Sequence, residues 1–250
     1  MTSPYREIIL VLENETAKTE IFTEIMIIQE RNPGETGRDY AYRMMRYNIV
    51  YRELKPGAML SEKEIADQLG LSRTPVREAF IELAKTGIIE VLPQRGSRVA
   101  YIDYAMVEEA DFVRMALEKA VVELVCSMRS ENDLKELREN IMLQEFYLQD
   151  PDHIRLLELD NAFHKKMFQI AGKMQAYAMM DGICVHFDRV RDLSIGAVKD
   201  LKIVDDHKKI LEAIEAQDAK QASEILTHHL QRFRLEEDAI REIYPEYFEK

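Results

Sequence analysis

The spacing of hydrophobic positions divides the chain into two parts. Up to about residue 101, short helical repeats are followed by two runs of β-forming residues, whereas beyond it apolar residues recur only at helical spacing. Six helical segments are predicted in the second part, at residues 104–129, 131–149, 152–172, 174–194, 200–216 and 218–241. Because short connections between long helices favour antiparallel neighbours, this part is expected to form an all-α antiparallel bundle.

Residues 60–80 have the pattern of two short helices joined by a tight turn at Gly70. Hydroxyl and arginine side chains stand at the start of the second helix. A recognition helix enters the major groove of DNA by its N-terminal end, so side chains that contact bases or phosphates are expected there. The pattern therefore predicts a helix-turn-helix whose second helix presents to DNA Ser72, Arg73, Thr74 and Arg77.

Two β-prone runs, residues 88–92 and 97–101, flank a short connection that contains Arg95 and Gly96. A glycine in such a connection is typical of a β-hairpin. A hairpin directly after a recognition helix would be a wing, with Arg95 and Arg98 at its tip lying over phosphate or the minor groove. Small α+β domains of other kinds also carry hairpins with exposed arginines, so this wing is informative only together with the helices before it.

In their order along the chain, these features resemble the winged-helix domain of the GntR family of bacterial transcriptional regulators. The resemblance extends from about Tyr40 to Tyr101 and rests on residues 54–57, 61–62, 71–79, 87 and 93–96. It implies that DNA contacts come from Lys63, Ser72, Arg73, Thr74, Arg77 and Gly96. Lys63 departs from the arginine often found at its position, and a lysine still meets a phosphate but loses the bidentate geometry.

The net charge of −12 is distributed unevenly along the chain. Residues 37–99 contain 11 basic and 8 acidic residues, whereas residues 1–36 contain 3 and 7, and residues 100–250 contain 20 and 31. The positive excess therefore lies on the predicted DNA-binding part, as phosphate binding requires. Because one copy of so weakly basic a unit would bind poorly, the charge favours a homodimer with two units on two half-sites of a double-stranded DNA operator.

Composition says more about the cellular compartment of the protein than about its function. Hydrophobic residues make up 46% of the chain, enough for a buried core, and no window reaches the length of a membrane span. The apolar run from Ile8 to Leu12 is too short for a signal peptide and lacks a basic lead-in. Cys126 and Cys184 lie far apart in helical patterns and are expected to be buried thiols in a reducing compartment. These features predict a cytoplasmic protein with no membrane partner.

Four side chains of the predicted bundle are candidate metal ligands. Asp160 and His164 are four residues apart on one helix face, and His207 and His229 are expected at similar heights on the last two helices. Three imidazoles and one carboxylate suit Zn²⁺ or Ni²⁺, with Mn²⁺ as a further candidate. The alternative is a surface salt link between Asp160 and His164, solvated histidines, and a bundle that serves only dimerisation.

The second part of the chain also resembles the FCD domain, which defines the FadR subfamily of GntR regulators, from about Met106 to Phe233. The resemblance implies a divalent cation at the floor of a pocket for a small organic acid effector, with the ligands Asp160, His164, His207 and His229. It also implies arginines that clamp the effector's carboxylate, and the candidates are Arg114, Arg189 and Arg191. For each arginine the alternative is a surface ion pair.

The sequence therefore predicts a mainly α transcriptional regulator in three segments. Residues 1–36 form an N-terminal extension, residues 37–101 a winged helix-turn-helix DNA-binding domain, and residues 102–250 an all-helical FCD domain for effector binding and dimerisation. The extension has a helical pattern from Glu13 to Glu30 and is either a docked helix or a mobile arm. Two other functions stay open: a metal-dependent enzyme acting on a small organic acid, and a binding module whose metal is purely structural. An enzyme is not expected, because no general base stands at fixed spacing beside the ligands.

Overall fold

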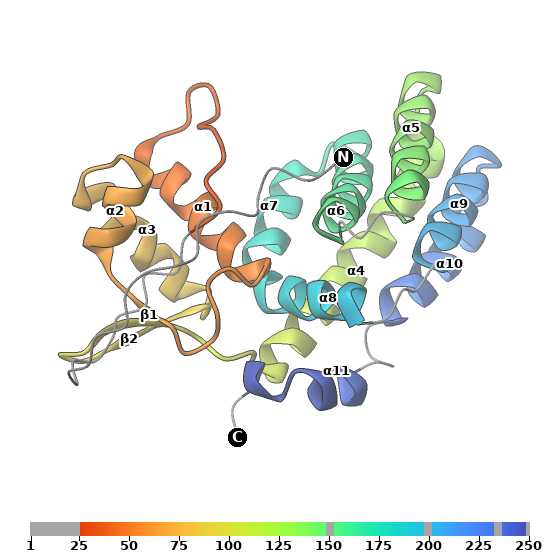
Figure 1. The fold of residues 1–250 in the computed structure, drawn as a ribbon. Coiled ribbons are helices and arrows are strands. Elements are labelled where there is room, and N and C mark those ends of the chain that lie inside the picture. The colour runs from red at the N-terminus through yellow and green to blue at the C-terminus, as the bar shows by residue number, and fades with distance from the viewer. Residues whose placement is uncertain (1–25, 149–152, 198–201, 233–236, 249–250) are drawn as a thin grey trace, which may run out of the picture.

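The computed structural model describes residues 26–148, 153–197, 202–232 and 237–248. In Figure 1 the N-terminal unit lies on the left and a bundle of helices on the right. The predicted fold class, mainly α with a small sheet followed by an all-helical part, is confirmed. The N-terminal unit consists of α1 (Gly37–Val50), β1 (Met59–Leu60), α2 (Glu62–Leu69), α3 (Arg73–Lys85), β2 (Ile89–Leu92) and β3 (Gly96–Val99).

The helix-turn-helix is formed by α2 and α3, joined at Gly70. Gly70 ends α2 in the left-handed conformation, with φ of 63°, which a glycine adopts without steric cost. The apolar face of α3 packs on α1, so that the opposite side of its first turns faces solvent. Ser72 is the N-cap of α3, but its side chain makes no capping hydrogen bond. The hydroxyl therefore stays available at the exposed start of the helix.

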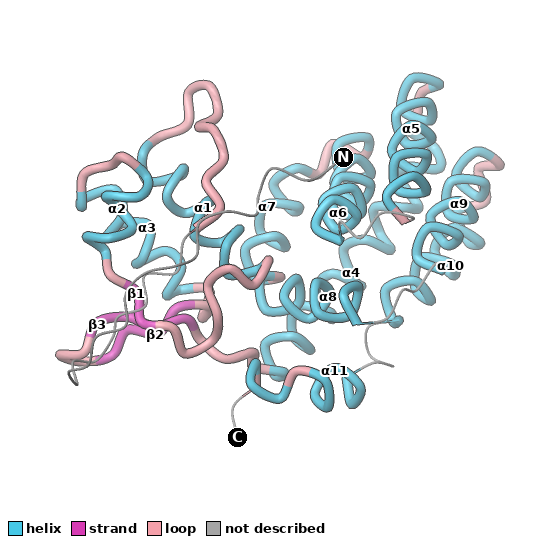
Figure 2. The backbone as a smooth tube through the Cα atoms, viewed as in Figure 1, coloured by secondary structure: helices cyan, strands magenta, loops and turns pink. Residues whose placement is uncertain are grey.

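The wing is part of a three-stranded antiparallel sheet with the strand order β1-β3-β2, shown in magenta in Figure 2. The predicted hairpin is present: β2 pairs with β3 from Ile89 opposite Val99 to Leu92 opposite Gly96. Strand β1 was not predicted, because two residues are too few to show a period of two. Its pairing to the other side of β3 anchors the wing to the loop before α2.

The second unit is built from helices of varied length. Its members are α4 (Tyr104–Met128), α5 (Glu131–Tyr147), α6 (His153–Ile170), α7 (Met174–Ile183), α8 (Val185–Ala197), α9 (Lys202–Glu215), α10 (Ala219–Gln231) and α11 (Glu237–Ile243). The single helix predicted for residues 174–194 is two helices that meet at Cys184, and the second of them continues past the predicted end to Ala197. Periodicity missed this break because Cys184 and Val185 are both buried. The predicted final segment is likewise divided, since α10 ends at Gln231 and α11 begins at Glu237.

The described part of the N-terminal extension, residues 26–36, lies across the winged helix, and we call it the strap. Residues 26–32 contain no helix, so the helix predicted up to Glu30 does not continue there, and the rest of that prediction lies outside the described residues. The buried Asn48 of α1 holds the strap: its Oδ1 accepts from Ile27 N at 2.7 Å and its Nδ2 donates to Ile27 O at 3.0 Å. Met26 is buried and its backbone N–H donates to Gln68 of α2.

The two units share a core and a set of ion pairs. Leu157 of α6 and Val185 of α8 belong to the apolar cluster of the winged helix. Arg46 of α1 reaches across to α7 and α8, and Arg52 lies 2.6 Å from the buried carboxylate of Asp192. Helix α8 therefore contacts α1, the helix that supports α3, so that a movement of α8 acts on α1 directly.

Candidate metal centre and DNA interface

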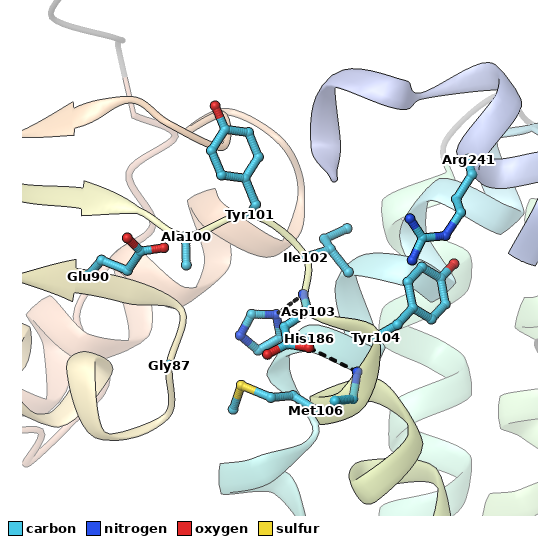
Figure 3. A pocket seen from close by; sticks show the side chains of 11 residues that line it. Gly87, Glu90, Ala100, Tyr101, Ile102, Asp103, Tyr104, Met106, His186 and Arg241 are labelled. Carbon is cyan, nitrogen blue, oxygen red and sulfur yellow. Dashed lines mark hydrogen bonds between the residues drawn. The ribbon is translucent and has the colours of Figure 1, made fainter. Parts of the chain in front are cut away.

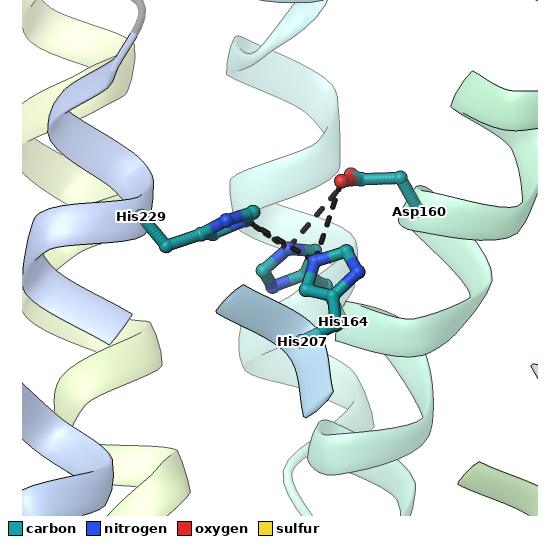
Figure 4. A group of neighbouring side chains, drawn as sticks. All are labelled: Asp160, His164, His207 and His229. Atoms are coloured by element: carbon teal, nitrogen blue, oxygen red, sulfur yellow. Dashed lines mark hydrogen bonds and ion pairs between the residues drawn. The ribbon is translucent and has the colours of Figure 1, made fainter. Parts of the chain in front are cut away.

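Three imidazoles and one carboxylate meet inside the bundle, as Figure 4 shows. Asp160 and His164 come from α6, His207 from α9 and His229 from α10, and one ligand atom from each lies within 4.8 Å of all the others. His229 Nε2 is 3.2 Å from His164 Nε2 and 3.2 Å from His207 Nε2. All four side chains are buried, so the alternative of surface ion pairs and solvated histidines does not hold. We call these residues the four-ligand cluster.

The outer nitrogen of each imidazole faces an oxygen. Nδ1 of His164 contacts Glu118, Nδ1 of His207 lies 2.7 Å from Gln144 Oε1, and Nδ1 of His229 lies 3.7 Å from Asp206 Oδ2. The hydrogen bonds to Glu118 and Gln144 fix the orientation of two of the rings, which is the usual environment of metal-binding histidines, whereas His229 Nδ1 has no hydrogen-bond partner among the described residues. Sequence reasoning gave no role to Glu118, Gln144 or Asp206. Glu118 had a signal in its helical spacing from Arg114, whereas Gln144 had none.

Burial and charge keep the cluster in a form that binds cations. Burial lowers the pKa of His164, although Glu118 opposes the shift, and burial together with His229 lowers the pKa of His207. Both imidazoles are thus neutral at physiological pH, as coordination requires. Burial works to raise the pKa of Asp160, but Arg191 and the imidazoles lower it overall, so that its carboxylate is charged. The donor set therefore fits a divalent cation of the Zn²⁺ type.

Two of the three candidate arginines lie beside the four-ligand cluster. Arg114 and Arg191 line a small cavity of about 20 Å³ that also touches His164, and we call it the arginine cavity. Arg191 pairs with Asp160, and Arg114 pairs with Glu118 at 2.6 Å. The structure does not bring Arg189 there: its Nη1 donates to Ala100 O, in the segment that joins the two units.

The residues proposed to contact DNA lie together at the surface. Lys63 on α2 and Arg73, Arg77 and their hydroxyl neighbours on α3 are exposed, as are Arg95 and Gly96 at the tip of the wing. Arg98, further down the wing, is held by Glu90 at 2.8 Å on the adjacent strand. The start of α3 and the wing tip thus present exposed cationic side chains. Arg98 does not lie at the tip as predicted, because it pairs with Glu90 within the sheet.

A second pocket, of about 420 Å³, lies where the winged helix meets the bundle (Figure 3). Several of its polar side chains are already engaged, although His186 Nε2 has no hydrogen-bond partner among the described residues. Asp103 caps α4 through Ala105 N, and His186 Nδ1 lies 3.4 Å from Asp103 N. Arg241 stacks over the Tyr104 ring, with its guanidinium carbon 4.3 Å from the centroid. The pocket therefore belongs to the joint between the units, and the four-ligand cluster does not border it.

Comparisons with known proteins agree with this architecture. Residues 38–99 match the bacterial regulatory proteins of the gntR family, and residues 111–232 match the FCD domain. The chain is 34% identical over 216 residues to the HTH-type transcriptional repressor RspR of Escherichia coli (strain K12), covering 86% of this chain and 93% of that protein. It is 28% identical to the probable D-xylose utilization operon transcriptional repressor of Paenarthrobacter nicotinovorans, covering 73% and 80%. The solved structure of E. coli McbR/YncC has the same fold, with a TM-score of 0.73 at 21% identity over 84% of this chain and 99% of that one.

The winged helix, its exposed recognition helix and the helical second unit define a DNA-binding regulator of transcription. The chain belongs to the GntR family, with an FCD domain after the winged helix. The prediction that the protein is not an enzyme is confirmed, because the chain belongs to a family of transcriptional regulators. Among the described residues, no helix is long and apolar enough to cross a membrane.

We expect the chelator-treated protein to lose stability as the pH falls from about 7 to about 5. Burial places the folded-state pKa of His164 and His207 below the ordinary value of 6.5, so below that pH the unfolded chain binds more protons than the folded one. The stability that is fully present above pH 6.5 is therefore lost as the pH decreases. Urea unfolding across this range measures the effect. Replacing both histidines by glutamine should flatten the dependence, and an unchanged slope in that variant would contradict the assignment.

Proposed function

We propose that this protein is a ligand-responsive regulator of the FadR subfamily, which binds a divalent cation and a small carboxylate metabolite in its FCD domain. The observation that carries the proposal is the four-ligand cluster, whose donor atoms lie within 4.8 Å of one another beside the arginine cavity. Zn²⁺ or Ni²⁺ suits the donors, with Mn²⁺ as a further candidate. Residues 37–101 serve DNA binding and residues 102–250 serve effector binding and dimerisation, in a protein of the cytoplasm.

The chemistry of the arginine cavity favours an anionic effector. Arg114 and Arg191 can each hold a carboxylate through two parallel hydrogen bonds. A bound cation would supply positive charge. Because four protein ligands complete a tetrahedral shell, an oxygen of the effector would enter as a fifth ligand. Because the cavity measures only about 20 Å³, Arg191 would have to turn from Asp160 to receive such a ligand. The carboxylate of Asp160 would then be available to coordinate the cation.

A screen by thermal shift tests this assignment against a purely structural metal. We expect small hydroxy and sugar acids to raise the melting temperature of the zinc-loaded protein, since a ligand that binds only the folded state stabilises it. The shift should vanish after chelation. If the metal raises the melting temperature but no organic acid adds to it in the screen, the cation is structural and the effector proposal fails.

The metal ligands can be tested with two adjacent histidines. We expect His229→Ala to lower both the zinc content and the melting temperature, because it removes a buried donor of the four-ligand cluster. His228→Ala is the matched control, since the His228 side chain is exposed on the same turn of α10. Elemental analysis of the purified proteins measures the metal. Full metal occupancy in His229→Ala, or loss of metal in His228→Ala, would show that the site has been assigned to the wrong face of α10.

DNA binding is assigned to the exposed start of α3. We expect Arg73→Ala and Arg77→Ala each to weaken operator binding by about 1–3 kcal/mol, if the side chains reach bases. Lys220→Ala on α10 is the control, because that lysine is equally cationic and exposed but belongs to the bundle. A sequence selected from a random DNA pool serves as operator in a gel-shift titration. Unchanged affinity of both arginine variants would refute the assignment of α3 as recognition helix.

We also propose that the protein is a homodimer through α4 and α7. Phe112 of α4 and Met179 and Ile183 of α7 are exposed apolar side chains on two helices that pack together. In Figure 1, α7 lies beside α1, whereas α5 lies on the far side of the bundle. A two-fold contact at α7 would therefore bring two winged helices close enough for neighbouring half-sites.

We expect Met179→Glu to produce a monomer, because it places a charge in this apolar contact. Met142→Glu on α5 is the control: Met142 is 66% exposed and Met179 is 75% exposed, so the two changes differ in location and hardly in environment. Analytical ultracentrifugation at micromolar concentration measures the assembly. A monomeric wild type, or a dimeric Met179→Glu protein, would contradict the proposed interface.

A further inference from the structure

Four charged side chains form a continuous chain of contacts from the four-ligand cluster to the winged helix. Arg191 pairs with Asp160, and its Nη1 donates to Asp188 Oδ1 at 3.1 Å. Arg46 Nη2 of α1 donates to Asp188 Oδ2 at 2.8 Å and to Asp181 Oδ1 at 3.1 Å. We call Asp160, Arg191, Asp188 and Arg46 the ion-pair chain.

The charges in this chain alternate in sign and are poorly screened. Asp160, Arg191 and Asp188 are buried, and the side chain of Arg46 is 23% exposed. Interactions between such groups are stronger than between surface charges, and each responds to its neighbours. Asp188 has an arginine on either side, one from the bundle and one from the winged helix. The strength of the ion pair between Asp188 and Arg46 therefore depends on how strongly Asp188 interacts with Arg191.

Two members of the ion-pair chain, Arg191 and Asp188, border the arginine cavity, which makes them sensitive to what it contains. Arg191, Asp188 and Asp181 all line the cavity, while Arg46 reaches the two carboxylates from outside. A ligand there meets the acidic partners of α1 directly. No longer path through the bundle is needed to connect the cavity with the helix that supports α3.

We infer that the Asp188–Arg46 ion pair transmits the charge of the metal centre to the winged helix. The inference rests on the proposed cation at the four-ligand cluster. When Asp160 coordinates a cation, its carboxylate attracts Arg191 less. Arg191 then interacts more strongly with Asp188, and the ion pair between Asp188 and Arg46 weakens. When a carboxylate in the cavity takes Arg191, Asp188 is released to Arg46 and the contact with α1 tightens. Coupling of this kind is reciprocal, so DNA on the winged helix also changes affinity at the cavity.

A second ion pair between the units provides a control. Arg52 contacts Asp192 at 2.6 Å, and Asp192 is fully buried on α8, as the docking of the two units requires. Asp192 does not line the arginine cavity. Loss of Arg52 thus weakens the attachment of the winged helix without interrupting the ion-pair chain.

Amide hydrogen exchange of the full-length protein, with Zn²⁺ added after chelation, tests the inference. We expect zinc to slow exchange in α6, α9 and α10 and to accelerate it at least about twofold in the last turns of α1 around Arg46. General stabilisation would slow both regions, so the opposite signs identify the chain. In Arg46→Met the response of α1 should disappear while the bundle is still protected, and in Arg52→Met both responses should remain. Asp188→Asn, which removes the negative charge from the other side of the ion pair, should act on α1 as Arg46→Met does.

The outcomes separate this inference from the proposed function. If zinc protects α9 and α10 but exchange in α1 is unchanged or slower, the metal site stands and the ion-pair chain is refuted. The ion-pair chain is also refuted if Arg46→Met keeps the response of α1, or if Arg52→Met abolishes it as well, since the effect then reflects docking in general. If zinc protects no part of the bundle, the proposed metal centre itself fails, and the inference fails with it.

Discussion

Ionised groups inside the bundle need partners, and this constraint decides how α6, α8, α9 and α10 pack. Carboxylates at the centre lie against arginines, in the pairs Glu118–Arg114, Asp160–Arg191 and Asp206–Arg232. Removing one member of such a pair would leave a buried charge without compensation, which costs several kcal/mol. The bundle is therefore held by specific contacts as well as by its apolar core, and burial keeps the imidazoles of His164 and His207 neutral although the carboxylates oppose this.

Much of this arrangement follows from spacing along the chain. Asp160 and His164 are one helical turn apart, and His207 and His229 are expected at similar heights on the last two helices, so helix geometry gives two pairs of ligands. That the two pairs meet was implied by the resemblance to the FCD domain. The two helices α2 and α3 were likewise predicted from residues 60–80. The positions of these helices could be predicted because they depend on local periodicity and on one short connection.

Features that depend on tertiary contacts were not visible in the sequence. Periodicity could not divide α7 from α8, because the residues at the joint are buried on both sides. It also could not separate Arg189 from Arg191: two positions apart on α8, they point in different directions, one to Ala100 and one to Asp160. Arg46 carried no signal at all, since its partners lie more than 130 residues away. Only the docking of α1 on α8 reveals its role.

The start of α3 has a consequence for how DNA is held. Ser72 occupies the N-cap without bonding the backbone, so the amide hydrogens of the first turn have no side-chain acceptor from this residue. A phosphate that reached them would accept those hydrogen bonds and meet the positive end of the helix dipole. The nucleic acid would then complete the helix that reads it, and the same atoms would serve folding and recognition.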